Sequence, residues 1–186
     1  MMSGSFPFKI LFWVLCILQC MPNITFGCVP EERIALMHTQ SSLMKSNSEV
    51  PSSWGQSDDC CSWESVTCND DSTRVSGLHL FGIHEGGPWN LNLEIFSPFH
   101  ELLLLDLSWN MLSGLQNIDA LRGLTKLRNL DLSGNIYEDD DIMGSLGKFT
   151  SLEVINLAMN NMSGTLKNTA FGNLKNLREL HLRQIS

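Results

Sequence analysis

The 186-residue chain is poor in basic side chains. It holds 12 lysine and arginine residues against 20 aspartate and glutamate residues, a formal net charge of −8. Because nucleic-acid-binding proteins need a basic surface that neutralises phosphates, we expect no nucleic-acid partner. The chain also lacks a glycine-rich phosphate-binding loop, and none of its five histidines lies in a motif with a serine or cysteine nucleophile. The sequence therefore predicts neither an enzyme nor a bound cofactor.

Long apolar runs are absent apart from nine apolar residues at 10–18. A transmembrane helix needs about 20, so this run is too short to span a bilayer. Lys9 precedes it, and Thr25 and Gly27 occupy the −3 and −1 positions of a cleavage after residue 27. These features are typical of a secretory signal peptide at 1–27, with an uncleaved anchor as the alternative. No other stretch is long enough to cross a membrane, and we expect an exported, extracellular chain.

Metal-binding motifs are also missing. Three consecutive aspartates at 139–141 could ligate calcium, which takes several oxygen ligands. The chain has neither EF-hand spacing nor a bidentate glutamate at the right distance from them. We interpret this run as a solvated acidic loop and predict no metal site.

Cysteine is limited to six residues, two of them inside the predicted signal peptide. The mature chain keeps Cys28, Cys60, Cys61 and Cys68, and an even set in an oxidising compartment indicates two disulfides. A bond between the adjacent Cys60 and Cys61 would be strained. Either Cys28 pairs with Cys60 and Cys61 with Cys68, or the pairs are crossed. A zinc site competes, but the chain lacks a C-x-x-C motif and a histidine at ligand spacing.

What the chain does contain is a repeat of 25 residues. The strings Leu-Asp-Leu-Ser-Trp-Asn at 105–110, Leu-Asp-Leu-Ser-Gly-Asn at 130–135 and Ile-Asn-Leu-Ala-Met-Asn at 155–160 share one pattern, and Leu-His-Leu follows at 180–182. Upstream apolar positions keep the same register, for example Leu102, Leu127, Leu152 and Leu177. A fixed period of this kind is the signature of a solenoid, in which each unit buries its apolar face against its neighbours.

Each full unit predicts one short strand and one buried asparagine, whereas the fourth has Ile185 where the asparagine is due. In Leu-x-Leu both leucines point inward and the residue between them points outward. Asn110, Asn135 and Asn160 belong to the inward series. A buried amide is tolerated only if its donors and acceptor are paired. We interpret these asparagines as a structural ladder that bonds the turn backbone of its own coil and of the adjacent coil.

Residues 28–77 differ from the repeats. Pro30 followed by two glutamates is typical of a helix start. A partly one-sided apolar pattern continues to about Lys45, with Ile34, Leu36, Met37, Leu43 and Met44. Trp54 and Trp63 flank the adjacent cysteines, and we expect them to build a small core.

The segment between this unit and the repeats is less regular. Residues 75–80 alternate like a strand and are expected to open the sheet. Residues 81–95 break the period, with a turn-rich excursion at 85–88. We divide the mature chain into the unit 28–77, an irregular first coil and connecting loop at 78–95, and repeats at 96–186, three full and one truncated.

Several motifs point to one family. They are Cys-x-x-Glu-Glu-Arg-x-Ala-Leu at 28–36, Pro-Ser-Ser-Trp at 51–54, Asp-Cys-Cys-Ser-Trp-Glu-x-Val-x-Cys at 59–68, and Ser-Gly at 113–114 and 163–164. The first three resemble the N-terminal cap of plant leucine-rich-repeat receptor-like proteins, and the repeats resemble the plant subclass of leucine-rich repeats. The usual Ile-Pro at the end of that repeat is missing, which argues against a second sheet on that flank.

The resemblance implies an α/β leucine-rich-repeat solenoid with short parallel strands on its concave face and a disulfide-bonded helical cap. It implies that Cys28 pairs with Cys60 and Cys61 with Cys68, and that the chain is exposed to the apoplast. Family members bind peptide or protein ligands in defence or development, and full-length forms sit in the plasma membrane and signal with receptor-kinase partners. Those forms have many more repeats, so we interpret this chain as truncated, with a deliberately short secreted protein as the alternative. The alternative function is a secreted inhibitor similar to polygalacturonase-inhibiting proteins.

Outward strand positions line the concave side in this fold, and we expect a ligand to bind there. The candidates are Asp106, Trp109, Arg128, Asp131, Glu153, Asn156, Met159, Arg178 and His181. Trp109 is the most informative, because an outward indole is costly to leave in water and tryptophan is enriched at binding hot spots. The alternative is that its ring packs on the neighbouring coil.

Glycosylation gives the first testable prediction. Asn161 begins the only Asn-x-Ser/Thr sequon outside the predicted signal peptide. Its side chain should turn outward, because it follows the inward Asn160. Secreted from plant cells, the protein should carry one N-glycan, and an N161Q variant should lack it. Intact-mass spectrometry before and after glycosidase treatment checks this, and an unchanged mass would contradict it.

Overall fold

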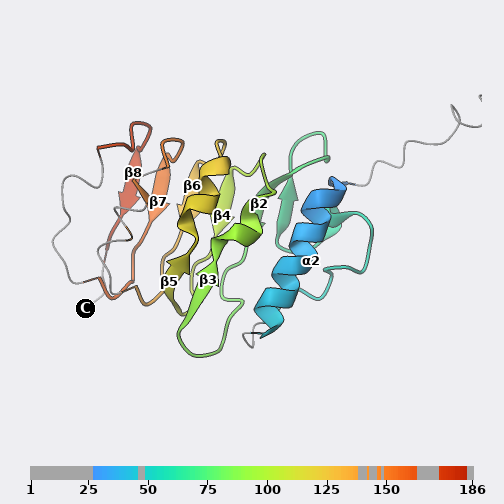
Figure 1. The fold of residues 1–186 in the computed structure, drawn as a ribbon, viewed down its shortest axis with the longest axis horizontal. Helices are drawn as coiled ribbons and strands as arrows, with labels where there is room; N and C mark the ends of the chain where they lie inside the picture. Colours follow the sequence, from blue (N-terminus) through green and yellow to red (C-terminus); the bar gives the residue numbers. More distant parts are fainter. Residues whose placement is uncertain are drawn as a thin grey trace, which may run out of the picture.

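The computed structural model describes residues 27–45, 49–137, 142, 146–147, 149–162 and 172–183. The predicted signal peptide, apart from Gly27, and the aspartates at 139–141 lie outside these residues. The main element is a six-stranded sheet in the order β1-β2-β4-β6-β7-β8. In Figure 1 the strands follow one another from the helix α2 at one end to β8 at the other. The predicted leucine-rich-repeat solenoid is confirmed.

The strands of this sheet are short. Their bounds are β1 (Val66–Cys68), β2 (Val75–His79), β4 (Leu104–Asp106), β6 (Asn129–Asp131), β7 (Val154–Asn156) and β8 (Glu179–His181). All neighbours from β2 onward pair in parallel, whereas β1 pairs with β2 antiparallel. The expectation that residues 75–80 open the sheet was therefore wrong by one strand. The cap adds β1 in front of β2.

The register of the parallel strands places equivalent residues side by side. Leu105 pairs with Leu130, Leu130 with Ile155, and Ile155 with Leu180. The step from Leu78 to Leu105 is longer, at 27 residues instead of 25. All of these side chains are buried except Leu180, which is half-buried. Each fully buried leucine contributes about 1.5–3 kcal/mol, so the stacked columns are the main source of stability.

The asparagine ladder joins successive coils. Asn135 Oδ1 accepts hydrogen bonds from the amides of Asn110 and Leu112, each at 3.0 Å. Its Nδ2 donates to the carbonyl of Leu107 in the preceding coil at 3.0 Å and to that of Leu132 in its own coil at 2.9 Å. Asn110 and Asn160 are buried as well, and each bonds backbone groups of its own coil and of the preceding one. These side-chain amides form hydrogen bonds with backbone N–H and C=O groups of the turns, which are buried and cannot bond water.

A second sheet lies on the flank of the array. β3 (Trp89–Asn92) pairs in parallel with β5 (Leu112–Gln116), and each is followed by a short 3₁₀ helix, η2 (Leu93–Phe96) and η3 (Ile118–Gly123). The argument against a second sheet was wrong here, because backbone pairing between neighbouring coils does not require Ile-Pro. The indole of Trp89 adds a hydrogen bond to the carbonyl of Asn110 at 2.7 Å.

The helix α2 (Pro30–Lys45) covers the N-terminal end of the sheet (Figure 1). Its predicted bounds are confirmed, but its apolar residues do not share one face. Leu36 and Leu43 are buried, whereas Ile34, Met37 and Met44 are exposed. Small and polar side chains, Ala35 and Thr39 among them, complete the buried face, which a purely apolar pattern does not reveal.

Two disulfides hold the rest of the cap together. Cys28 is bonded to Cys60 with Cα atoms 5.8 Å apart, and Cys61 to Cys68 with Cα atoms 5.5 Å apart. The short helix η1 (Cys60–Ser62) carries two of these cysteines. Trp54 and Trp63 are buried beside them, with ring centroids 6.2 Å apart. This compact arrangement provides a core in a segment with few aliphatic residues.

One carboxylate connects the cap helix to the sheet. Glu32 is fully buried, and its Oε1 accepts a hydrogen bond from Arg74 Nε at 2.8 Å. Its Oε2 accepts one from the backbone amide of Val75, also at 2.8 Å, at the first residue of β2. A buried charge is tolerated only with such partners.

We predict that an E32A substitution lowers the free energy of unfolding by about 3 kcal/mol, because it leaves the buried amide of Val75 and the Arg74 guanidinium without their acceptor. Urea unfolding of the disulfide-bonded protein measures this. The matched control is D58A, which breaks an exposed ion pair between Asp58 and Arg33, a residue of the same helix as Glu32. It should change the free energy by less than about 1 kcal/mol. Equal effects of the two substitutions would contradict the prediction.

Candidate ligand-binding face

The outward side chains of β2, β4, β6, β7 and β8 form one continuous surface, called here the outward sheet face. Register aligns one residue from each strand into a polar row, namely His79, Asp106, Asp131, Asn156 and His181. Neighbouring strands lie about 4.8 Å apart, so these side chains are close enough to meet a single ligand. The structure thereby brings four of the sequence-predicted candidates into one row.

The two aspartates of this row are held in place at their strand ends. Asp106 Oδ1 accepts a hydrogen bond from the amide of Ser108 at 2.9 Å. Asp131 Oδ1 accepts one from the amide of Ser133 at 2.9 Å and one from its hydroxyl at 2.6 Å. Asp131 Oδ2 also accepts a hydrogen bond from Asn156 Nδ2 at 2.9 Å. The carboxylates are therefore ordered without any ligand.

A second group of charges lies just before the strands. Glu153 stands between two arginines, with Oε1 at 3.3 Å from Arg128 Nε and Oε2 at 3.5 Å from Arg178 Nε. Arg128 also donates to the carbonyls of Thr125 and Ser151. The group carries one net positive charge. These exposed ion pairs add only about 0–1 kcal/mol of stability each, so they shape the surface potential more than the fold.

Trp109 lies at the far end of the outward sheet face, where the chain turns. The equivalent residues of successive coils all have positive φ, at 60° for Gly82, 58° for Trp109, 63° for Gly134 and 56° for Met159. Glycine adopts this conformation freely, whereas for a residue with a β carbon the conformation costs about 1–2 kcal/mol of free energy. Trp109 and Met159 adopt it despite this cost. Both leave apolar surface exposed, with exposed fractions of 50% for Trp109 and 37% for Met159.

The indole of Trp109 packs on the next coil. A β carbon at Gly134 would lie 2.6 Å from ring atoms Cδ2 and Cε2, so only glycine leaves room for the ring. The alternative that the ring packs on the neighbouring coil is thus confirmed, and ligand binding at the exposed half of Trp109 stays a prediction.

Two residues of this surface were missed by the sequence reasoning. His79 continues the polar row, and Phe81 is 61% exposed. Both lie in the first coil, which is separated from the second by 27 residues, so a search at a strict 25-residue spacing does not find them. The string Leu-His-Leu at 78–80 has the Leu-x-Leu spacing of the other strands, and that signal could have identified the coil.

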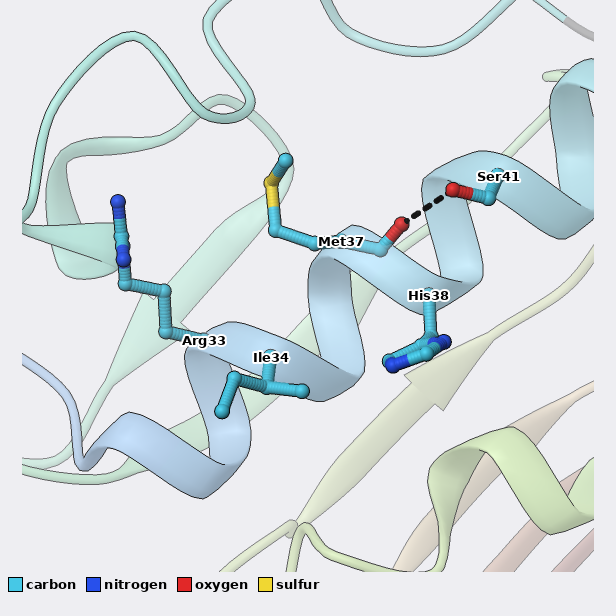
Figure 2. Close-up of a pocket in the computed structure, with 5 residues that line it drawn as sticks. All are labelled: Arg33, Ile34, Met37, His38 and Ser41. Carbon is cyan, nitrogen blue, oxygen red and sulfur yellow. Dashed lines mark hydrogen bonds between the residues drawn. The ribbon is translucent and has the colours of Figure 1, made fainter.

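One hollow lies on the cap and another lies between the cap and the first repeat, and both are open to solvent. Figure 2 shows the first, of about 190 Å³, on the outer side of α2, lined by Arg33, Ile34, Met37, His38 and Ser41. Ser41 Oγ donates to the carbonyl of Met37 there at 3.0 Å. The second, of about 580 Å³, is lined by Val29, Glu31, Arg74, Ser97, Pro98 and His100.

Among the described residues, Glu101 and Tyr137 have perturbed pKa values, and neither lines the outward sheet face or the two hollows. A hydrogen bond from Lys126 lowers the pKa of Glu101, and burial raises the pKa of Tyr137. Both have structural causes. Within the described parts of the chain, no group of three or more histidine, cysteine, aspartate or glutamate residues could hold a metal ion.

Comparisons with known proteins agree with this architecture. The leucine rich repeat N-terminal domain family matches residues 29–69. Putative receptor-like protein 8 of Arabidopsis thaliana is 31% identical over 92% of this chain and 18% of its own length. Cuscuta receptor 1 of Solanum lycopersicum is 31% identical over 95% of this chain and 17% of its own length. The chain thus spans less than a fifth of these relatives.

Solved structures of similar fold include plant receptor ectodomains. A chain of the BIR3–SERK2 complex from Arabidopsis thaliana has a TM-score of 0.59 at 27% identity, over 77% of this chain and 78% of that one. The Arabidopsis receptor kinase HAESA ectodomain, in complex with an N-terminally extended IDA peptide hormone, has a TM-score of 0.53 at 26% identity, over 81% and 29%.

The disulfides and these relatives fit an extracellular or membrane-associated location. Among the residues that the structure describes, no helix has the length and apolar character needed to cross a membrane. The cap motifs, the stacked coils and the similarity over most of the chain show that it belongs to the plant leucine-rich-repeat receptor-like proteins.

Proposed function

We propose that this chain is a non-catalytic extracellular recognition module of the apoplast, which binds a peptide or protein ligand on its outward sheet face in defence or development signalling. The observation that carries the proposal is the make-up of that face. It combines ordered carboxylates, a cationic group around Glu153 and exposed apolar residues, among them Leu103, Trp109 and Met159. Aromatic residues, methionine and arginine are enriched in protein-recognition surfaces.

The relatives support a peptide or protein as the partner. The HAESA ectodomain is described in complex with a peptide hormone, and the BIR3–SERK2 structure is a complex of two proteins. Both structures are similar in fold to this chain. For a longer form of the protein we extend the proposal to a receptor-kinase co-receptor.

A site-specific photo-crosslinker tests where the ligand binds. Asn129 is exposed and points outward from β6, whereas Arg122 is exposed on η3, away from the sheet. Placed at 129, a benzophenone side chain should give discrete adducts with apoplastic fluid, and the same group at 122 should not. An additional E153R substitution should lower the adduct yield at 129 at least ten-fold, because it replaces the carboxylate between two arginines by a third cation. Equal labelling at 129 and 122 would contradict the proposal.

The alternative function is tested separately. The purified chain is added in excess to a fungal polygalacturonase, and release of reducing ends from polygalacturonate is measured. We expect unchanged enzyme activity. Stoichiometric inhibition would favour the inhibitor function and overturn the receptor assignment.

A further inference from the structure

We propose that Trp109, Asp106 and Asp131 form a binding site for the cationic side chain of an arginine or lysine in an extended basic peptide. The inference rests on the proposed function and names the class of its ligand. It is carried by three features of the outward sheet face: an indole with one supported side and one exposed side, two ordered carboxylates beside it, and apolar surface in the adjoining coils.

The first feature is the placement of the indole. Its ring lies over Gly134, where an added β carbon would come within 2.6 Å of it, so the glycine supports one side of the ring. Half of the residue remains exposed, and tryptophan is the aromatic side chain with the strongest attraction for a cation over its face. Because the ring is already packed on one side, a ligand group would meet a surface that needs no rearrangement.

The second feature is the position of the carboxylates. Asp106 is bonded to Ser108, the residue before Trp109, and Asp131 to Ser133, the residue before Gly134. Each carboxylate is thus held toward the turn on which the indole rests. A guanidinium or ammonium group over the ring would have both within reach.

The charges on this side of the face are not balanced by the protein. Asp106 and Asp131 are in register on neighbouring strands, and like charges placed opposite each other are unfavourable. Among the described residues, neither forms a salt bridge, and Arg128 and Arg178 are paired with Glu153 at the other end of the strands. His79 flanks Asp106 in the row, with Nε2 bonded to Thr67. A cation from the ligand would relieve the repulsion, and this charge complementarity selects a basic partner.

The third feature extends the site along the array. The amide of Gly82 bonds the carbonyl of Ser108, and the amide of Gly134 bonds that of Ala158. These bonds place Phe81 in the coil on one side of Trp109 and Met159 beyond Gly134 on the other, both exposed. Apolar surface over several coils suits the backbone and aliphatic stems of an extended peptide, which a free metal ion would not use.

Isothermal titration calorimetry on the disulfide-bonded protein tests the proposal. The probe is acetyl-(Ala-Arg)₃-amide, and the matched control peptide replaces each arginine by citrulline, which keeps the shape and removes the charge. We expect the arginine peptide to bind at least ten-fold more tightly. Its affinity should weaken as salt rises, because the carboxylates are only partly buried and salt screens charges near the surface. Equal affinities would overturn the proposal.

The key variant is W109G, which places at this turn the residue found at Gly82 and Gly134. Because glycine relieves the positive-φ conformation, the variant should unfold at the same urea concentration or a higher one, yet lose at least ten-fold in peptide affinity. D106N/D131N should lose as much. E64Q/E94Q, which removes two exposed carboxylates elsewhere, should bind as the unmodified chain does. Undiminished binding by W109G, or tighter binding of cellohexaose than of the arginine peptide, would overturn the site.

Failure here is distinguishable from failure of the proposed function. If crosslinking at position 129 persists in W109G while the arginine peptide does not bind the unmodified chain, the outward sheet face still recognises a ligand and only the cationic site is wrong. If neither experiment gives binding, both proposals fall.

Discussion

The rest of the structure depends on the buried amide at the turn of each coil. A coil of 25 residues cannot close without burying backbone groups that no strand or helix satisfies, and unpaired buried groups cost free energy. Asn135 resolves this by accepting from two amides and donating to carbonyls of two coils. Because its partners lie in its own coil and the preceding one, the side chain also sets the distance and rotation between coils. The parallel register of the strands follows from this repeated connection.

The turn that the amide closes has a second consequence for the binding surface. It requires positive φ one residue before the asparagine position, which Ile83 occupies in the first coil, and glycine is free of strain there. Gly82 and Gly134 follow that preference, whereas Trp109 and Met159 do not. The alternation leaves room beside each large side chain, so the indole lies over Gly134 and stays half exposed. A local backbone requirement thereby determines where an apolar platform can form.

The cap solves a different problem. The first coil of a solenoid has no preceding coil to cover its apolar edge, and uncovered edges favour association. Here the cap covers that edge with α2, with the antiparallel strand β1, and with the core of two tryptophans beside the disulfides. The buried carboxylate of Glu32 connects helix and sheet with two hydrogen bonds. The same covering leaves Ile34, Met37 and Met44 exposed on the outer side of the helix.

The sequence by itself determined the parts that repeat. Leucine columns, the Leu-x-Leu strands and the inward asparagines recur at a fixed period because every coil meets the same neighbour, so the pattern of one unit describes the next. The cap was predicted from its resemblance to family motifs. Its helix was predicted from the residues at the helix start, Pro30 and the two glutamates after it, whose effect on the backbone is local. Tertiary structure alone decided the features that depend on an unlike neighbour. Three features require knowledge of which residue of another segment lies opposite. They are the pairing of β3 with β5, the burial of Ala35 and Thr39 instead of Ile34, and the packing of Trp109 on Gly134. Periodicity records which residues recur, and only packing shows what each of them contacts.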